Sequence, residues 1–230
     1  MIGPAASDRV ELADGQLAVR PGGTPLYAAR ALRQAGAACV AVESGHLHSW
    51  VRHTGSTTEQ RLGAMPEPLA PSRARALLPR LAGCQWVLLG GQTGGDFPPE
   101  TIRVLTDAGH RVLLDGQGLA RGTRGGPVQL GPIDPTWYAG TTVLKLNEAD
   151  AAAAGSLAHV PELLLTHGTA GASITAGGAT IEVAGSGAEF TDPTGAGDSL
   201  SALYCLARAL GREPADACWF AIDGVERLYK

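Results

Sequence analysis

Short apolar runs alternate with longer amphipathic segments along most of the chain. The apolar runs predict buried strands, at residues 86–89, 111–114, 142–146 and 162–166. The amphipathic segments predict helices, at residues 26–35, 72–81, 98–108, 148–154, 195–210 and 214–225. Short apolar strands separated by helices indicate a mainly parallel sheet that is covered on both faces. The expected fold class is therefore α/β, in a single domain over residues 1–230.

Additional strands are predicted outside this regular alternation. Residues 8–20 predict a hairpin that turns at Asp14 and Gly15, and residues 172–183 predict a second hairpin. Residues 38–42 are expected to form a buried strand. Alternation at 47–51 and 57–62 allows two strands within the polar stretch 44–63. Ser72 is the expected N-cap of the helix at 72–81.

Composition and charge narrow the class of protein. Apolar residues make up 44% of the chain and charged residues 17%, which is typical of a globular protein. The net charge is −4 without a long basic run, so nucleic acids and anionic membranes are not expected partners. No apolar stretch reaches the roughly 18 residues that a spanning helix needs. Four widely spaced cysteines and the lack of a signal-peptide pattern predict a cytoplasmic location.

The glycine-rich segment 192–198 carries the strongest chemical signal. Gly195 and Gly197 allow the backbone to approach a phosphate closely, and the helix that begins there directs its N–H groups and positive dipole end at an anion. Asp198 lies in the first turn of this helix, where a carboxylate could accept a proton from an attacking hydroxyl. A glycine-rich loop followed by an acidic helix start is also common without any catalytic role.

Four segments, in the same order along the chain, resemble the ribokinase-like (PfkB) carbohydrate and nucleoside kinase family. Asp-Pro-Thr-Gly-Ala-Gly-Asp at 192–198 is similar to the family signature D-T-x-G-A-G-D, and it is not a Walker loop because no G-K-[ST] follows. Gly22-Gly23 with the following helix resembles the first family signature. Residues 145–150 resemble K-x-N-x-x-E, and residues 166–171 resemble T-x-G-x-x-G. The resemblance implies a three-layer α/β/α fold.

The resemblance also implies catalytic and cofactor residues. Asp198 would be the base, and the backbone amides of Gly195, Ala196 and Gly197 would form an anion hole for the transferred phosphoryl group. An ATP site would include Lys145, Asn147, Thr166, Gly168, Gly171 and Thr194. Asn147 and Asp150 would act near Mg²⁺, whose ligands are usually oxygens.

The acceptor would be a small polyol, such as a sugar, cyclitol or nucleoside. The residues that the resemblance places around it are Asp8, Gly22, Gly23, Asp115 and Gln117, and Arg121 is a further pocket or phosphate contact. Tyr27 stands about where many family members have an asparagine, which predicts a bulkier or more apolar contact to the acceptor. Residues 8–20 and 44–63 would form a reduced β lid or a clasp between the subunits of a homodimer.

The chain looks like a shortened member of the family, which is usually nearer 300 residues. The segments after Asp198 that usually enclose the adenine base are reduced to 32 residues. We therefore expect an ATP- and Mg²⁺-dependent kinase. The alternatives are a degenerate member that binds nucleotide or sugar without transferring phosphate, and a different α/β enzyme that uses the same anion hole. A metal site at His46, His48 and His53 is a less favoured reading of the polar strands.

Overall fold

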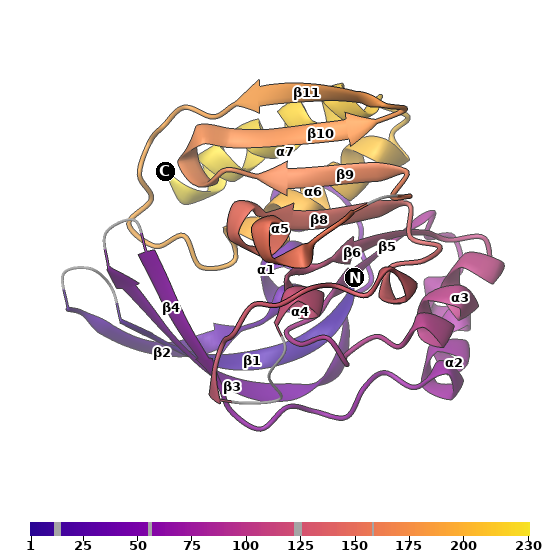
Figure 1. Cartoon of the computed structure of the whole chain (residues 1–230), viewed down its shortest axis with the longest axis horizontal. Coiled ribbons are helices and arrows are strands. Elements are labelled where there is room, and N and C mark those ends of the chain that lie inside the picture. The colour runs from indigo at the N-terminus through magenta and orange to yellow at the C-terminus, as the bar shows by residue number, and fades with distance from the viewer. Residues whose placement is uncertain (12–14, 55–56, 122–125, 158) are drawn as a thin grey trace.

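All the strands that the structure describes belong to one sheet (Figure 1). The structure is a computed structural model, and it describes residues 1–11, 15–54, 57–121, 126–157 and 159–230. The strands are β1 (Ile2–Glu11), β2 (Leu17–Gly22), β3 (Val42–Thr54), β4 (Thr57–Leu62), β5 (Trp86–Gly90), β6 (Arg111–Asp115), β7 (Gly126–Pro127), β8 (Val143–Asn147), β9 (Glu162–Thr166), β10 (Gly171–Ala176) and β11 (Ala179–Ala184). Their order is β11-β10-β9-β8-β6-β5-β1-β3-β4-β7, and β2 pairs with β1.

The centre of the sheet is parallel, as the sequence predicted. Strands β5, β6, β8 and β9 pair in parallel in that order, and β1 pairs in parallel with both β3 and β5. The central β5 is buried at every position and reads Trp-Val-Leu-Leu-Gly, the continuous apolar run expected of a strand covered on both faces. The predicted second hairpin is also present, because β10 and β11 pair antiparallel.

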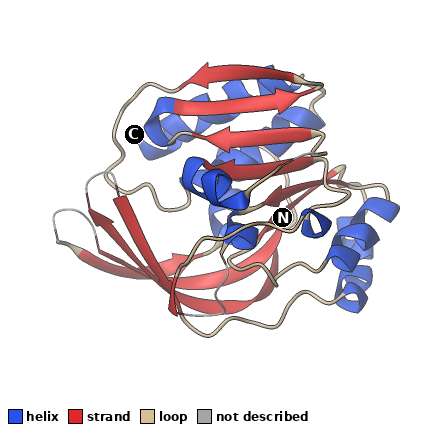
Figure 2. Ribbon diagram, in the orientation of Figure 1, coloured by secondary structure: helices blue, strands red, loops and turns tan. Residues whose placement is uncertain are grey.

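Helices cover both faces of the sheet, which gives the three layers that the family resemblance implied (Figure 2). The helices are α1 (Thr24–Gln34), α2 (Pro71–Leu81), α3 (Pro99–Asp107), α4 (Gln117–Ala120), α5 (Glu148–Ala154), α6 (Ala196–Ala209) and α7 (Pro214–Tyr229). On one face α1, α6 and α7 pack together over a core that includes Leu113, Val143 and Tyr204. On the other face α2 and α3 pack over a second core that includes Leu89 and Leu114.

Four strands of the sheet, β1 to β4, project beyond its parallel centre as two antiparallel hairpins. The first joins β1 to β2 with Val10 opposite Ala18, and the second joins β3 to β4 with Val51 opposite Gln60. The parallel pairing of β1 with β3 joins the two hairpins, and a small apolar cluster of Ala6, Leu47 and Leu62 lies on the same strands. The hairpin predicted over residues 8–20 is thus present, and so are the two strands predicted within 44–63. The predicted turn residue Asp14 lies outside the described residues. Their function as a lid or a dimer clasp stays a prediction.

Two local predictions were wrong. Residues 38–41 form no strand; Ala38, Cys39 and Ala41 are exposed in the connection between α1 and β3, which begins only at Val42. Ser72 is not a cap, because α2 begins at Pro71, whose fixed φ suits the first helical position.

Over the part of the chain that the structure describes, we find no helix with both the length and the apolar character that a membrane crossing requires.

Candidate active site

A cavity of about 770 Å³ lies between the carboxyl ends of the central strands and the projecting hairpins. The end of each of three parallel strands contributes a polar side chain: Asp115 from β6, Asn147 from β8 and Thr166 from β9. The hairpins contribute residues such as Trp50 and Arg61, and the loop 193–198 completes the lining. Ligands of parallel α/β sheets bind at this edge of the sheet.

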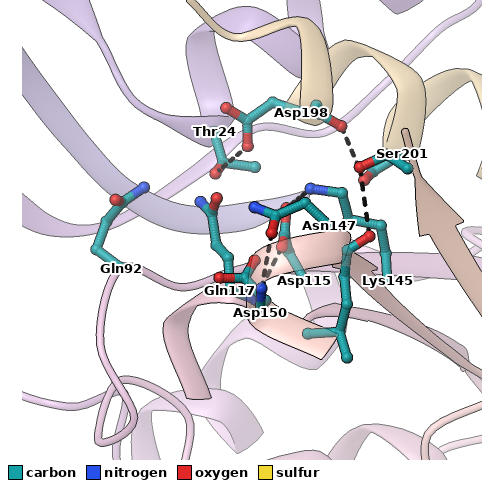
Figure 3. A network of polar contacts seen from close by, with 12 residues as sticks. Thr24, Gln92, Asp115, Gln117, Lys145, Asn147, Asp150, Asp198 and Ser201 are labelled. Carbon is teal, nitrogen blue, oxygen red and sulfur yellow. Dashed lines mark hydrogen bonds and ion pairs between the residues drawn. The ribbon is translucent and has the colours of Figure 1, made fainter. Parts of the chain in front are cut away.

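The predicted base Asp198 lies in the first turn of α6 and faces this cavity (Figure 3). Its Oδ1 accepts a hydrogen bond of 2.5 Å from the Thr24 hydroxyl. Thr24 is fully buried in the first turn of α1, and a Cβ on the neighbouring Gly90 would come within 2.1 Å of its hydroxyl oxygen. Because Thr24 is confined in this way, it fixes the orientation of the Asp198 carboxylate.

The surroundings of Asp198 raise its pKa to about 6. Burial is the largest cause, and the nearby negative charge of Asp115 adds to it. The hydrogen bond from Thr24 and the positive charge of Lys145 act in the opposite direction and favour the carboxylate. A carboxyl group with this pKa is ionised at neutral pH and is still basic enough to accept a proton, as general base catalysis requires.

The predicted anion hole is formed by the loop before α6. Gly195 caps the helix in the left-handed region, with φ of 81°, and both Gly195 and Gly197 line the cavity. The Ala196 N–H instead donates to the carbonyl of Pro193 at 3.0 Å, and Ala196 is not among the lining residues. The geometry therefore favours the amides of Gly195 and Gly197 as anion ligands over that of Ala196.

A buried ion pair lies beside this loop. Lys145 Nζ donates to Asp115 Oδ2 at 3.1 Å, and both residues are almost inaccessible to solvent, at 3% and 2% exposure. A Cβ on Gly197 would lie 3.0 Å from Lys145 Nζ, so the ammonium group is directly next to the predicted anion hole. Lys145 is thus held where it can stabilise negative charge on a phosphoryl group.

The predicted Mg²⁺ residues lie at the same edge of the sheet. Asn147 caps α5, and its Oδ1 accepts from the Asp150 N–H at 2.8 Å. Asp150 is buried, lines the cavity, and has an Oδ2 that lacks a hydrogen-bond partner among the described residues. No three His, Cys, Asp or Glu side chains within the described ranges form a metal cluster. One free carboxylate oxygen suits Mg²⁺, which is usually held by one or two carboxylates together with phosphates and water.

Four of the five predicted acceptor residues, Asp8, Gly23, Asp115 and Gln117, line the cavity, and Gly22 does not. Asp8 is buried, and its carboxylate accepts hydrogen bonds from the hydroxyls of Tyr27 and Ser49. A Cβ on Gly22 would come within 1.7 Å of Asp8 Oδ2, so this position requires glycine. Gly23 lines the cavity and caps α1 with φ of 91°.

Arg121 provides a cation in the wall of the cavity. Its guanidinium donates to Gln92 Oε1 at 3.0 Å and to Gln117 Oε1 at 3.4 Å, and all three residues line the cavity. Arg121 Nε is buried and has no hydrogen-bond partner within the described residues. Asp115 also lines the cavity, and its carboxylate accepts from Lys145 at Oδ2 and from the Gln117 N–H at Oδ1.

Two of the predicted cofactor residues do not line the cavity. Gly168 begins a short 3-10 helix, and Gly171 begins β10. Gly171 has φ of 117°, and a Cβ there would come within 2.1 Å of the Val183 carbonyl, so the close approach of β11 explains this glycine. Their predicted contacts with a nucleotide stay predictions.

Sequence reasoning missed Thr24 and Gln92. Thr24 contacts Asp198 across 174 positions of the chain, and nothing in its local sequence indicates that contact. Gln92 lies two residues after the end of β5, so the rule that places ligands at the carboxyl ends of parallel strands could have found it. His46 and His48 lie on one exposed face of β3 with their rings 5.6 Å apart, and the His53 side chain lies outside what the structure describes.

Comparison with known proteins agrees with this geometry. The model of the pfkB family carbohydrate kinases matches residues 137–222. A comparison with curated protein sequences found no match.

Similar solved structures extend the likeness over almost the whole chain. One is a pyrophosphate-dependent kinase in the ribokinase family, complexed with a pyrophosphate analog and myo-inositol; identity is 18%, the TM-score is 0.75, and the match covers 96% of this chain and 91% of that one. The Arabidopsis thaliana ribokinase with ribose and ATP has 16% identity, a TM-score of 0.63, and coverage of 97% and 89%. A Burkholderia thailandensis nucleoside kinase with inosine has 15% identity, a TM-score of 0.71, and coverage of 97% and 88%. The ribokinase-like fold is confirmed.

Proposed function

From a chain with the ribokinase-like fold and a pfkB family match over residues 137–222, we propose a phosphotransferase that acts on an alcohol group of a small polyol. The observation that carries the proposal is the position of Asp198, a carboxylate with a raised pKa, directly beside the glycines of a helix N-terminus. A binding module needs no base at this place. The cavity between the hairpins and the sheet has room for a sugar, a cyclitol or a nucleoside.

In the proposed reaction, Asp198 takes the proton of the acceptor hydroxyl as its oxygen attacks the terminal phosphorus of the donor. A phosphate ester forms, and the bond between that phosphorus and the bridging oxygen of the donor breaks. The amides of Gly195 and Gly197, with the ammonium group of Lys145, stabilise the negative charge on the transferred group. Asp150 and Asn147 would hold Mg²⁺, which would neutralise negative charge on the donor phosphates. Asp8 and Gln92 would orient the acceptor.

Phosphate transfer to a panel of acceptors tests this proposal. Wild type is incubated with Mg²⁺, a phosphoryl donor and myo-inositol, ribose or inosine, and phosphate esters are detected by ³¹P NMR. The variant D198N is expected to lower kcat by about 10³, within the range usual for loss of a general base. As a control, D223N removes an exposed carboxylate on α7 and leaves kcat unchanged.

Two outcomes would contradict the assignment. A near-normal kcat in D198N would exclude Asp198 as the base. Calorimetric binding of donor and acceptor without turnover on any acceptor would favour the non-catalytic alternative. Location in the cytoplasm and assembly as a homodimer stay predictions.

A second candidate concerns the donor, which the sequence predicted to be ATP. The cavity reaches Thr166, Thr194 and Gly197 but includes no residue beyond Asp198 and neither Gly168 nor Gly171. Behind the anion-hole loop, the rings of Phe190 and Tyr229 pack 5.6 Å apart. The Tyr229 hydroxyl donates to the Thr194 carbonyl at 3.2 Å. Among the described residues, the donor side of the cavity offers room for phosphates and no pocket that extends beyond Asp198 to hold a base. This arrangement favours inorganic pyrophosphate, on which the similar pyrophosphate-dependent kinase depends.

Donor choice is measured as kcat/KM with the best acceptor of the panel. We expect pyrophosphate to exceed ATP by at least about tenfold, because an unbound adenosine contributes no binding energy and must be accommodated in solvent. The variant Y229A opens the space behind Thr194, and ATP should gain relative to pyrophosphate. A wild type that prefers ATP would contradict the pyrophosphate donor and support the donor predicted from the sequence.

A further inference from the structure

Tyr27 contacts both the acceptor side and the donor side of the cavity. It lies on α1, is buried to 7% exposure, and lines the cavity. Its hydroxyl donates to Asp8 Oδ2 at 3.2 Å. Its ring packs against Gly195, where an added Cβ would come within 2.2 Å of the ring carbon Cγ.

The hydrogen bond to Asp8 determines what this carboxylate can offer to an acceptor. Ser49 donates to Oδ1, and Tyr27 donates to Oδ2, so two donors from different elements fix the plane of the carboxylate. Burial and the nearby charge of Asp8 raise the pKa of Tyr27, so the phenol keeps its proton and remains a donor over the working pH range. Each Asp8 oxygen has a second lone pair that can accept from an acceptor hydroxyl.

The ring contact determines the shape of the anion hole. Gly195 has φ of 81°, a left-handed conformation that glycine adopts without strain at the N-terminus of α6. The flat face of Tyr27 supports the loop at this residue, because no side chain intervenes. A smaller side chain at position 27 would leave a space under Gly195 into which the loop could relax.

A third contact links the first hairpin to the anion-hole loop. Arg20 on β2 forms an ion pair with Asp192 at the start of the anion-hole loop, and it interacts electrostatically with Tyr27. The Asp192 carboxylate also accepts from the Thr194 N–H at 3.1 Å. The first hairpin, Tyr27 and the anion-hole loop therefore form one connected unit.

We propose that Tyr27 is a positioning residue that aligns the acceptor aspartate Asp8 with the anion hole at Gly195, through its hydroxyl on one side and its ring on the other. This inference rests on the proposed phosphotransfer function. The role of the hydroxyl and the role of the ring can be tested separately, because the hydroxyl affects acceptor binding and the ring affects binding of the donor anion.

Three variants test the proposal. Y27F keeps the ring and removes the hydroxyl; the acceptor KM should rise about tenfold while the affinity for Mg²⁺-pyrophosphate, titrated by calorimetry, stays unchanged. Y27L removes the ring as well; the pyrophosphate affinity should also fall, by about tenfold. Y204F is the matched control, because Tyr204 is another buried tyrosine that donates to a carboxylate, Glu162, at 2.6 Å. Loss of the Tyr204 hydroxyl should lower the stability of the fold and leave both the acceptor KM and the pyrophosphate affinity unchanged.

The outcomes distinguish this inference from the proposed function. Unchanged acceptor KM in Y27F, or unchanged pyrophosphate affinity in Y27L, would overturn the role of Tyr27. If Y27F and Y204F change the acceptor KM and the pyrophosphate affinity to the same extent, the effect of Tyr27 is purely structural. That result also overturns the proposed positioning role. A wild type that transfers no phosphate contradicts the proposed function, yet the calorimetric comparison of Y27L with Y27F still decides the contact with Gly195.

Discussion

At the scale of single residues, the Thr24 hydroxyl is one of the groups that set the pKa of Asp198. Thr24 donates to Asp198 Oδ1 at 2.5 Å. Burial raises the pKa of Asp198 and this hydrogen bond lowers it, and the resulting pKa is about 6. T24V removes this hydrogen bond with little change of volume. The pKa of Asp198 should then rise by about one pH unit, the usual effect of losing a bond to a charged group. Since the base must be ionised, the acid limb of kcat/KM should move to higher pH.

The pH profile of T24S supplies the control for this prediction. Serine keeps the hydroxyl, so the acid limb should stay near pH 6, and T24S and T24V should differ little above pH 8, where Asp198 is ionised in both. An acid limb that is the same in T24V and wild type would show that Thr24 does not tune the base.

The residues that the sequence could predict are those whose role follows from a local pattern. Asp198, Gly195 and Gly197 are recognisable because glycines at a helix start have a direct physical meaning. Thr24 and Tyr27 act through contacts that only the folded chain creates, with Asp198 and Gly195 respectively. A glycine in a family motif can also have a structural reason, because the close approach of β11 requires glycine at position 171 whether or not Gly171 contacts a nucleotide.

At the scale of elements, apolar runs predicted the parallel strands β5, β6, β8 and β9, and amphipathic periodicity predicted the longer helices. The parallel pairing of β1 with β3 and β5 was not predicted. Strand β9 (Glu162–Thr166) and helix α5 (Glu148–Ala154) have the bounds that the sequence predicted. Residues 38–41 were misread because a short run of small apolar residues suits an exposed connection as well as a buried strand. Helix α4, with only four residues, has no periodicity from which to predict it. The position of each element in the sheet came from the fold, since strand order leaves no local signal.

At the scale of the whole molecule, the two ends of the parallel strands have different tasks. Helix α6 carries Asp198 at the carboxyl ends of the strands and Arg208 near its own C-terminus, about 15 Å away at the rise of an α-helix. Arg208 donates to Glu162, the first residue of β9, at 2.7 Å, and Tyr204 donates to the same carboxylate at 2.6 Å. Thr166, the last residue of β9, lines the cavity. The amino ends of the strands therefore contribute to stability, and the carboxyl ends hold the site.

This division predicts that stability can be lowered without a change in substrate recognition. E162Q leaves the mostly buried Arg208 guanidinium without its carboxylate, and breaking such a pair costs about 3 kcal/mol of unfolding free energy. Urea denaturation should show this loss, while the KM values for donor and acceptor remain those of wild type. The double variant E162Q/R208M should recover much of the stability, because it also removes the uncompensated charge. A raised KM in E162Q would instead mean that α6 transmits changes at its C-terminus to Asp198, and the two ends of the sheet would then not be independent.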